Sequence, residues 1–108
     1  MSKNDRLQGS LDLLVLQTLT RGPMHGFGIT SHIEGVYQGA LQLEEGSLYP
    51  ALQRIQKEGW VTAEWKTTEN NRRARYYTLT AEGRRRLELA RENWDRVTSG
   101  VALVLNHV

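Results

Sequence analysis

The stretch GSLYPALQRIQKEGWV, from Gly46 to Val61, decides the fold of this chain together with RRARYYTLT at 72–80. The first stretch predicts a short helix, because Leu48, Leu52 and Ile55 recur at spacings of four and three. After Gly59 the pattern changes to alternation, which continues in the second stretch and predicts a β-hairpin. The chain is therefore built around a helix followed by a basic hairpin.

Two further helices are predicted ahead of this stretch. For the first, over Ser10–Leu19, we expect Ser10 as N-cap and a largely buried leucine surface, with helical spacing at Leu7, Leu11, Leu14 and Thr18. Arg21-Gly22-Pro23 stops it. The second begins at His25 and ends at Gly39, and its inward positions are Phe27 or Ile29, then Ile33 and Val36.

The helix that follows should start with Ser47 as cap, hold Pro50 in its first turn, and end at Gly59. Its face opposite the apolar stripe is polar. On this polar face, Gln53 is suited to bind an adenine edge, and Arg54 a guanine edge or a phosphate. Ser47, Tyr49 and Lys57 are suited to contacts with the DNA backbone. The alternative is an ordinary solvent-facing polar surface.

In the hairpin, one side carries Val61, Ala63 and Trp65, and the other carries Thr62, Glu64 and Lys66, with Tyr77 and Leu79 continuing the pattern on the return strand. The connection contains Asn70-Asn71, which tolerate left-handed turn conformations. Arg72, Arg73 and Arg75 stand together after it, either as a clamp on DNA backbone or minor groove or as a solvated charged loop. Three helices and then a hairpin is the winged-helix order.

Composition restricts the function classes. A chain of 108 residues suits one small domain plus one extra element, and its net charge of +2 is by itself weak support for nucleic acid. The chain has no cysteine, which excludes disulfides and thiolate metal sites and fits a cytoplasmic protein. We expect no membrane segment, since no apolar run is long enough.

Catalysis, cofactors and metal ions have little support in the sequence. His25 and His32 with Glu34 make a poor metal set, and no phosphate loop, nucleophile elbow or dinucleotide fingerprint is present. We expect His25 to be structural, at the start of the second helix.

Four segments resemble, in order, the signatures of the PadR-like transcriptional regulators. They are PMHGFGI at 23–29, GSLYPAL at 46–52, KEGWV at 57–61 and RYYTLTAEG at 75–83. The resemblance implies a winged helix-turn-helix that dimerises through a C-terminal helix and represses promoters until an effector or stress relieves repression. The single helix after residue 83 is similar to the short branch of that family.

The last helix should begin with Thr80 as N-cap and Glu82 in its first turn. An apolar seam follows at spacings of three and four, made of Leu87, Ala90, Trp94, Val97, Val101, Val104 and Val108. Either the seam packs on the protein's own first helix or it binds a second subunit. We favour a combination of the two, in which the early seam residues contact the body of the protein and those from Trp94 onward contact a second subunit. Trp94 either packs plainly or lines a cavity for a flat aromatic effector.

The sequence therefore predicts a mainly α protein with a small β-hairpin. Residues 1–80 should form a winged helix-turn-helix that binds DNA, and residues 81–108 a dimerisation helix. The predicted function is a homodimeric regulator, expected to be a repressor of near-palindromic operators. The alternative is a winged-helix module that binds another protein and no specific DNA.

Overall fold

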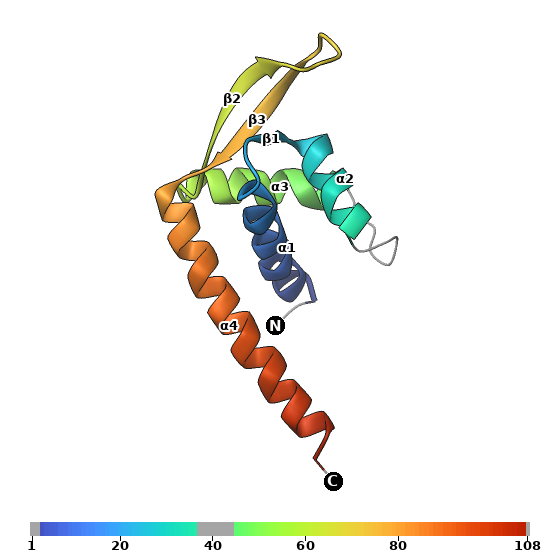
Figure 1. The fold of residues 1–108 in the computed structure, drawn as a ribbon, viewed down its shortest axis with the longest axis vertical. Helices are drawn as coiled ribbons and strands as arrows, with labels where there is room; N and C mark the ends of the chain where they lie inside the picture. Colours follow the sequence, from blue (N-terminus) through green and yellow to red (C-terminus); the bar gives the residue numbers. More distant parts are fainter. Residues whose placement is uncertain (1–2, 37–44, 108) are drawn as a thin grey trace.

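The computed structural model describes residues 3–36 and 45–107. The described chain forms, in order, α1 (Lys3–Leu19), β1 (Met24–His25), α2 (Gly26–Val36), α3 (Glu45–Lys57), β2 (Val61–Thr67), β3 (Arg73–Leu79) and α4 (Ala81–Leu105). In Figure 1, α1, α2 and α3 gather into one body, the β2–β3 hairpin rises from it, and α4 runs away in the opposite direction. This confirms the predicted mainly α fold with a small hairpin, the winged-helix arrangement.

The hydrophobic core forms around α1, which contacts α2, α3, α4 and β3. The predicted stripe of α3 is confirmed, since Leu48, Leu52 and Ile55 are all buried. From α2, Ile29 and Ile33 enter the core. Further core side chains come from α1, namely Leu11, Val15, Leu16 and Leu19.

The structure decides between two inward alternatives for α2 and corrects one further prediction. Of the alternatives Phe27 and Ile29, the buried residue is Ile29, and Phe27 is 77% exposed. Val36 is 65% exposed, because it is the last residue of α2 and lies at the rim of a small groove beside Leu14 and Ile33. The predicted end at Gly39 lies outside the described residues.

Two predicted helix starts are also wrong. Helix α1 already begins at Lys3, so Ser10 lies inside it and is not the N-cap. Helix α3 begins at Glu45, which places Ser47 in the first turn and Pro50 in the second. Proline there leaves one hydrogen bond to the preceding turn unmade, and we attribute its tolerance to the burial of Leu48, Leu52 and Ile55 around it.

The predicted end of α3 at Gly59 is confirmed. Gly59 has φ of 81°, a left-handed conformation that glycine adopts without steric cost. Its N–H donates to the Gln56 carbonyl (3.0 Å), and the Trp60 N–H donates to the Ile55 carbonyl (3.0 Å). This is the Schellman arrangement, which stops a helix and satisfies its last carbonyls.

The hairpin is an antiparallel pair in which Val61 lies opposite Leu79, Ala63 opposite Tyr77 and Trp65 opposite Arg75. Asn71 at its turn has φ of 63°, which confirms the left-handed prediction. A third strand, β1, pairs with β3 through Met24 and His25 and gives the sheet the order β1-β3-β2. Two residues are too few for a strand pattern to be visible in sequence.

Helix α4 starts as predicted, because the Thr80 hydroxyl accepts the Gly83 N–H at 3.0 Å. Gly83 and Leu87 are buried against the body, whereas the helix beyond Ala90 extends into solvent and gives the molecule a longest dimension of 58 Å. None of the helices in the described part of the chain has the length and apolar character needed to cross a membrane.

Candidate nucleic-acid interface

The polar face of α3 follows from the burial of its apolar stripe. Because Leu48, Leu52 and Ile55 point into the core, the residues on the opposite side of the helical wheel face outward. Tyr49, Gln53 and Lys57, spaced by four, are all exposed, while Ser47 is half-buried at the start of the helix. Four of the predicted contact residues of α3 are thus at least partly accessible to a ligand.

Arg54, the fifth, is held by the body of the protein. Its Nε donates to Asp12 Oδ2 at 3.3 Å and its Nη2 to Asp12 Oδ1 at 2.5 Å. Asp12 lies on α1 and is largely buried, so the pair joins α3 to α1. Charge-assisted bidentate pairs of this kind are geometrically specific. We therefore assign Arg54 a role in the fold, and its contact with DNA stays a prediction.

We call the β2–β3 hairpin, residues 61–79, the wing. Arg72 and Arg73 are exposed, and Arg75 is half-buried nearer the body. Trp65, which is not among the site residues predicted from the sequence, is 56% exposed and lies beside both Arg73 and Arg75. The signal was available in the sequence, because Trp65 and the arginines alternate onto one face of the hairpin.

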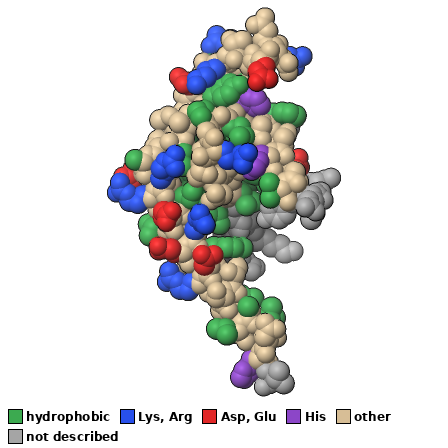
Figure 2. Space-filling view, viewed as in Figure 1, with side chains coloured by type: hydrophobic (Ala, Val, Ile, Leu, Met, Phe, Trp, Pro, Cys, Tyr) green, Lys and Arg blue, Asp and Glu red, His purple; other side chains and the backbone are tan. Residues whose placement is uncertain are grey.

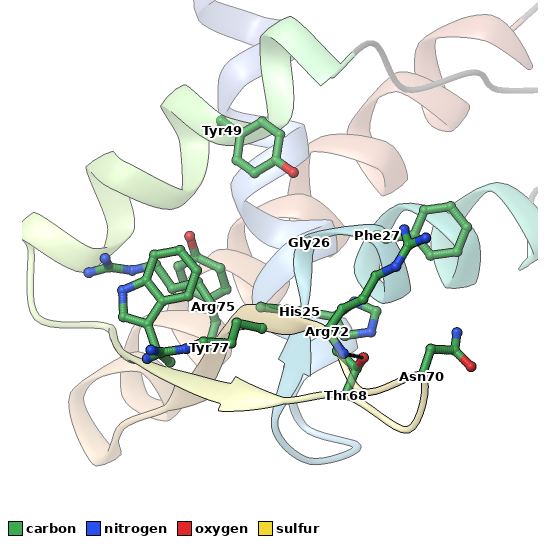
Figure 3. Close-up of a pocket in the computed structure, with 12 residues that line it drawn as sticks. His25, Gly26, Phe27, Tyr49, Thr68, Asn70, Arg72, Arg75 and Tyr77 are labelled. Atoms are coloured by element: carbon green, nitrogen blue, oxygen red, sulfur yellow. Dashed lines mark hydrogen bonds between the residues drawn. The ribbon is translucent and has the colours of Figure 1, made fainter.

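A groove of about 660 Å³ separates the wing from the start of α2 and from α3 (Figure 3). Its walls contain aromatic rings and guanidinium groups and, among the residues that the structure describes, no carboxylate. The lining residues are His25, Gly26, Phe27, Tyr49, Trp65, Thr68, Asn70, Arg72, Arg73, Ala74, Arg75 and Tyr77. The groove therefore brings Tyr49 of α3 and all three predicted wing arginines to one place, and its charge suits an anion.

Tyr77 adds no negative charge to this groove. Burial raises the pKa of its phenol above the ordinary value of 10.0, although the neighbouring Arg75 charge acts in the opposite direction. The hydroxyl consequently stays neutral near neutral pH. The electrostatic character of the groove is set by the arginines.

His25 has the structural position that the sequence predicts. Its Nδ1 accepts the Gly28 N–H at 2.9 Å, which caps the start of α2, and its ring meets Tyr76 edge-on at 5.2 Å. The α2 start also lies close to α3, since a Cβ on Gly26 would come within 3.3 Å of the Tyr49 hydroxyl oxygen. The close approach of α2 and Tyr49 fixes one wall of the groove.

The model of the transcriptional regulator PadR-like family matches residues 15–89, which include α2, α3, the whole wing and the start of α4. The chain belongs to this family. A PadR-like regulator of Bacillus cereus has a solved structure that is 25% identical to it, with a TM-score of 0.81 and coverage of 96% of this chain and 99% of that one. A transcriptional regulator from Clostridium thermocellum is 26% identical, with a TM-score of 0.82 and coverage of 91% and 95%.

Of two relatives known by sequence, one has nearly the length of this PadR-like chain and the other is much longer. An uncharacterised protein of Lysinibacillus sphaericus is 24% identical over 105 residues, 97% of this chain and 96% of its own length. Transcriptional regulator YqjI of Escherichia coli is 29% identical over 89 residues, which cover 82% of this chain but 41% of that protein. The chain thus spans less than half of YqjI. The family assignment makes it a transcriptional regulator.

The predicted apolar seam of α4 has a part that is at least half-buried and a part that is exposed. Leu87 is buried on the body and Ala90 is half-buried, which confirms that the early part contacts the rest of the chain. From Trp94 to Val104 the seam is exposed, and Figure 2 shows hydrophobic side chains on this projecting end of the molecule, while the last predicted seam residue, Val108, lies outside the described residues. The exposed fractions are 48% for Trp94, 51% for Val97, 50% for Val101 and 76% for Val104.

Proposed function

We propose that this PadR-like regulator binds double-stranded DNA as a homodimer and represses transcription from near-palindromic operators. The observation that carries the proposal is the groove, which Tyr49 of α3 and Arg72, Arg73 and Arg75 of the wing border together. A recognition helix and a cationic hairpin on one side of a protein can engage adjacent features of one duplex. A strand of phosphates running through the groove would meet both.

The proposed contact residues differ in which part of the DNA they would bind. Gln53 is exposed on α3 and can pair with an adenine edge in the major groove. Ser47, Tyr49 and Lys57 would hold the DNA backbone, and the wing arginines would clamp flanking phosphates or the minor groove. Arg54 has a structural role through its two hydrogen bonds to Asp12, and its contact with a guanine edge or a phosphate stays a prediction.

The homodimer is supported by the exposed part of the α4 seam, from Trp94 to Val104. An apolar stripe at heptad spacing on an unpartnered helix suits a second helix of the same kind. Two subunits related by a two-fold axis would place their α3 helices on half-sites about 34 Å apart, one turn of DNA. Operator near-palindromy follows from that symmetry.

Trp94 also belongs to the proposal as a candidate effector residue. It stands at the middle of the seam with its indole half-exposed, so it can either pack against the partner or form one wall of a cavity that accepts a flat aromatic molecule. Quenching of its fluorescence by small aromatic compounds, absent in Trp94→Phe, would support the ligand role. Equal quenching in both proteins would assign Trp94 to packing alone.

The test of DNA binding is fluorescence anisotropy of a labelled duplex from the gene's own upstream region, against a scrambled duplex, at several salt concentrations. We expect preference for the native duplex near physiological salt, with two chains per site. Equal binding to both duplexes that disappears with salt would contradict sequence-specific recognition and favour the protein-binding alternative.

Two variants distinguish contacts that position the DNA backbone from contacts that read the bases. Arg73→Ala should weaken binding to every duplex and lower the slope of log affinity against log salt by about 1. Gln53→Ala should leave non-specific binding unchanged and relax preference at particular bases by about 1–3 kcal/mol. Arg96→Ala removes the same charge from exposed α4 and is the control, with unchanged binding expected. An equal loss on native and scrambled DNA for Gln53→Ala would refute its role in reading bases.

A further inference from the structure

The positively charged side chains on the two faces of the wing have different neighbours. On the outer face, Lys66 Nζ lies 3.2 Å from Glu64 Oε1 and 5.6 Å from the centre of the Tyr76 ring. The Lys66 charge is therefore already paired. On the inner face, which lines the groove, Trp65 lies directly opposite Arg75. Arg73 is two residues from Arg75 on the same strand and therefore on the same face.

The indole of Trp65 is the shared neighbour of both arginines. The Cζ atoms of Arg73 and Arg75 lie 5.8 and 5.9 Å from its ring centroid, within the range of cation–π attraction. Within the described part of the chain, neither guanidinium forms an ion pair with a carboxylate. Their charges are held in place by the ring and remain available to an anion.

Because the ring holds both arginines in place beforehand, the free-energy cost of binding an anion is lower. An exposed arginine has a large rotamer entropy, which it loses when it grips a phosphate, and two neighbouring arginines also repel each other. The negative face of one indole attracts both and restricts them before any ligand arrives. An aliphatic side chain of similar size offers no such attraction.

We propose that Trp65 is a positioning residue that holds Arg73 and Arg75 toward the groove, where the two guanidinium groups bind phosphates of one DNA strand. Trp65 acts through the arginines and leaves base reading to α3. This inference rests on the proposed DNA-binding function and deepens it, because it names a residue outside the predicted contact set.

The variants Trp65→Phe and Trp65→Leu separate aromatic character from bulk. In the free protein, the NMR signals of the Arg73 and Arg75 Nε–H groups should be displaced by the ring in the parent chain and in Trp65→Phe, and should move to ordinary values in Trp65→Leu. Unchanged signals in Trp65→Leu would overturn the proposal without any DNA in the sample.

In anisotropy titrations, Trp65→Leu should weaken binding to native and scrambled duplexes alike by about three- to tenfold, and Trp65→Phe should restore most of the loss. In an Arg73→Ala, Arg75→Ala background the Trp65→Leu change should have no further effect. A loss that persists in that background, or equal behaviour of Trp65→Phe and Trp65→Leu, would overturn the positioning role.

Thermal unfolding provides the folding control for these variants. Trp65 is more than half exposed near the end of β2, so both substitutions should leave the melting temperature almost unchanged. A parent chain that binds no duplex would overturn the proposed function and this inference together. A parent chain that binds normally, with Trp65→Leu unaffected, would overturn the inference only.

Discussion

At the scale of single residues, Gly83 shows how a missing side chain can determine packing. It lies in the first turn of α4, and a Cβ at this position would collide with the Trp60 carbonyl oxygen and come within 2.7 Å of Leu79 Cδ1. The backbone of α4 therefore lies directly on the segment that joins α3 to the wing. The angle at which α4 leaves the body depends on this contact.

Replacement of Gly83 by alanine should therefore destabilise the protein, although alanine is normally the better helix former. We expect Gly83→Ala to lower the free energy of unfolding by about 2 kcal/mol or more, because backbone atoms must shift to admit the methyl group. Gly100→Ala, on the same helix with no heavy atom within 4 Å of the new Cβ, should raise it by about 0.8 kcal/mol. Urea denaturation at one fixed protein concentration measures both, and a change of the same sign would contradict the explanation.

At the scale of secondary-structure elements, the wing and α4 share one anchor, Thr80. Its hydroxyl accepts the Gly83 N–H at 3.0 Å and donates to the Gly59 carbonyl at 2.7 Å, and its own N–H donates to the Trp60 carbonyl at 3.0 Å. One residue thus caps α4 and ties it to the loop that ends α3. Helices α3 and α4 are coupled through this loop.

Thr80→Ala removes both side-chain hydrogen bonds and should lower the free energy of unfolding by about 1–2 kcal/mol, the usual cost of a lost N-cap. Thr80→Ser keeps the hydroxyl and should recover most of that loss. Chemical denaturation followed by circular dichroism compares the two variants. Equal destabilisation by alanine and serine would show that the methyl group of Thr80, and not its hydroxyl, is what matters.

At the scale of the whole molecule, the exposed end of α4 is the feature that a single chain leaves unexplained. Trp94, Val97 and Val101 are each about half exposed, and Val104 more so, along a helix that projects beyond the body (Figure 1). Apolar side chains gathered on one face favour a partner surface. In the proposed dimer, this face buries itself against a second copy.

Val101→Asp places a charge in the middle of that face and should convert the dimer to a monomer at micromolar concentration, since an unpaired charge in an apolar interface is costly. Ser99→Asp introduces the same charge on an exposed residue outside the seam and is the control. Light scattering after size-exclusion chromatography gives the masses. A Val101→Asp protein that stays dimeric would place the dimer interface elsewhere.

Several elements could be predicted from sequence because their signals are local. The α3 stripe, the Gly59 helix end, the alternation of the wing, the left-handed Asn71 and the Thr80 cap all depend on residues within a few positions of one another. The starts of α1 and α3 were predicted wrongly, since Ser10 and Ser47 have cap chemistry but lie within helices that begin earlier. A capping residue shows where a helix can begin, and tertiary packing decides whether it continues past that point.

The sequence predicts the types and order of all these elements except the two-residue strand β1, because hydrophobic periodicity, glycine, proline and capping chemistry act over short distances along the chain. Which polar groups remain available to a ligand depends instead on how the elements pack together. Arg54 is bound by Asp12, 42 residues away, whereas Arg73 and Arg75 share the Trp65 ring across the hairpin. Such pairings depend on how the elements pack in space, and the spacing of residues along one strand or helix does not record them.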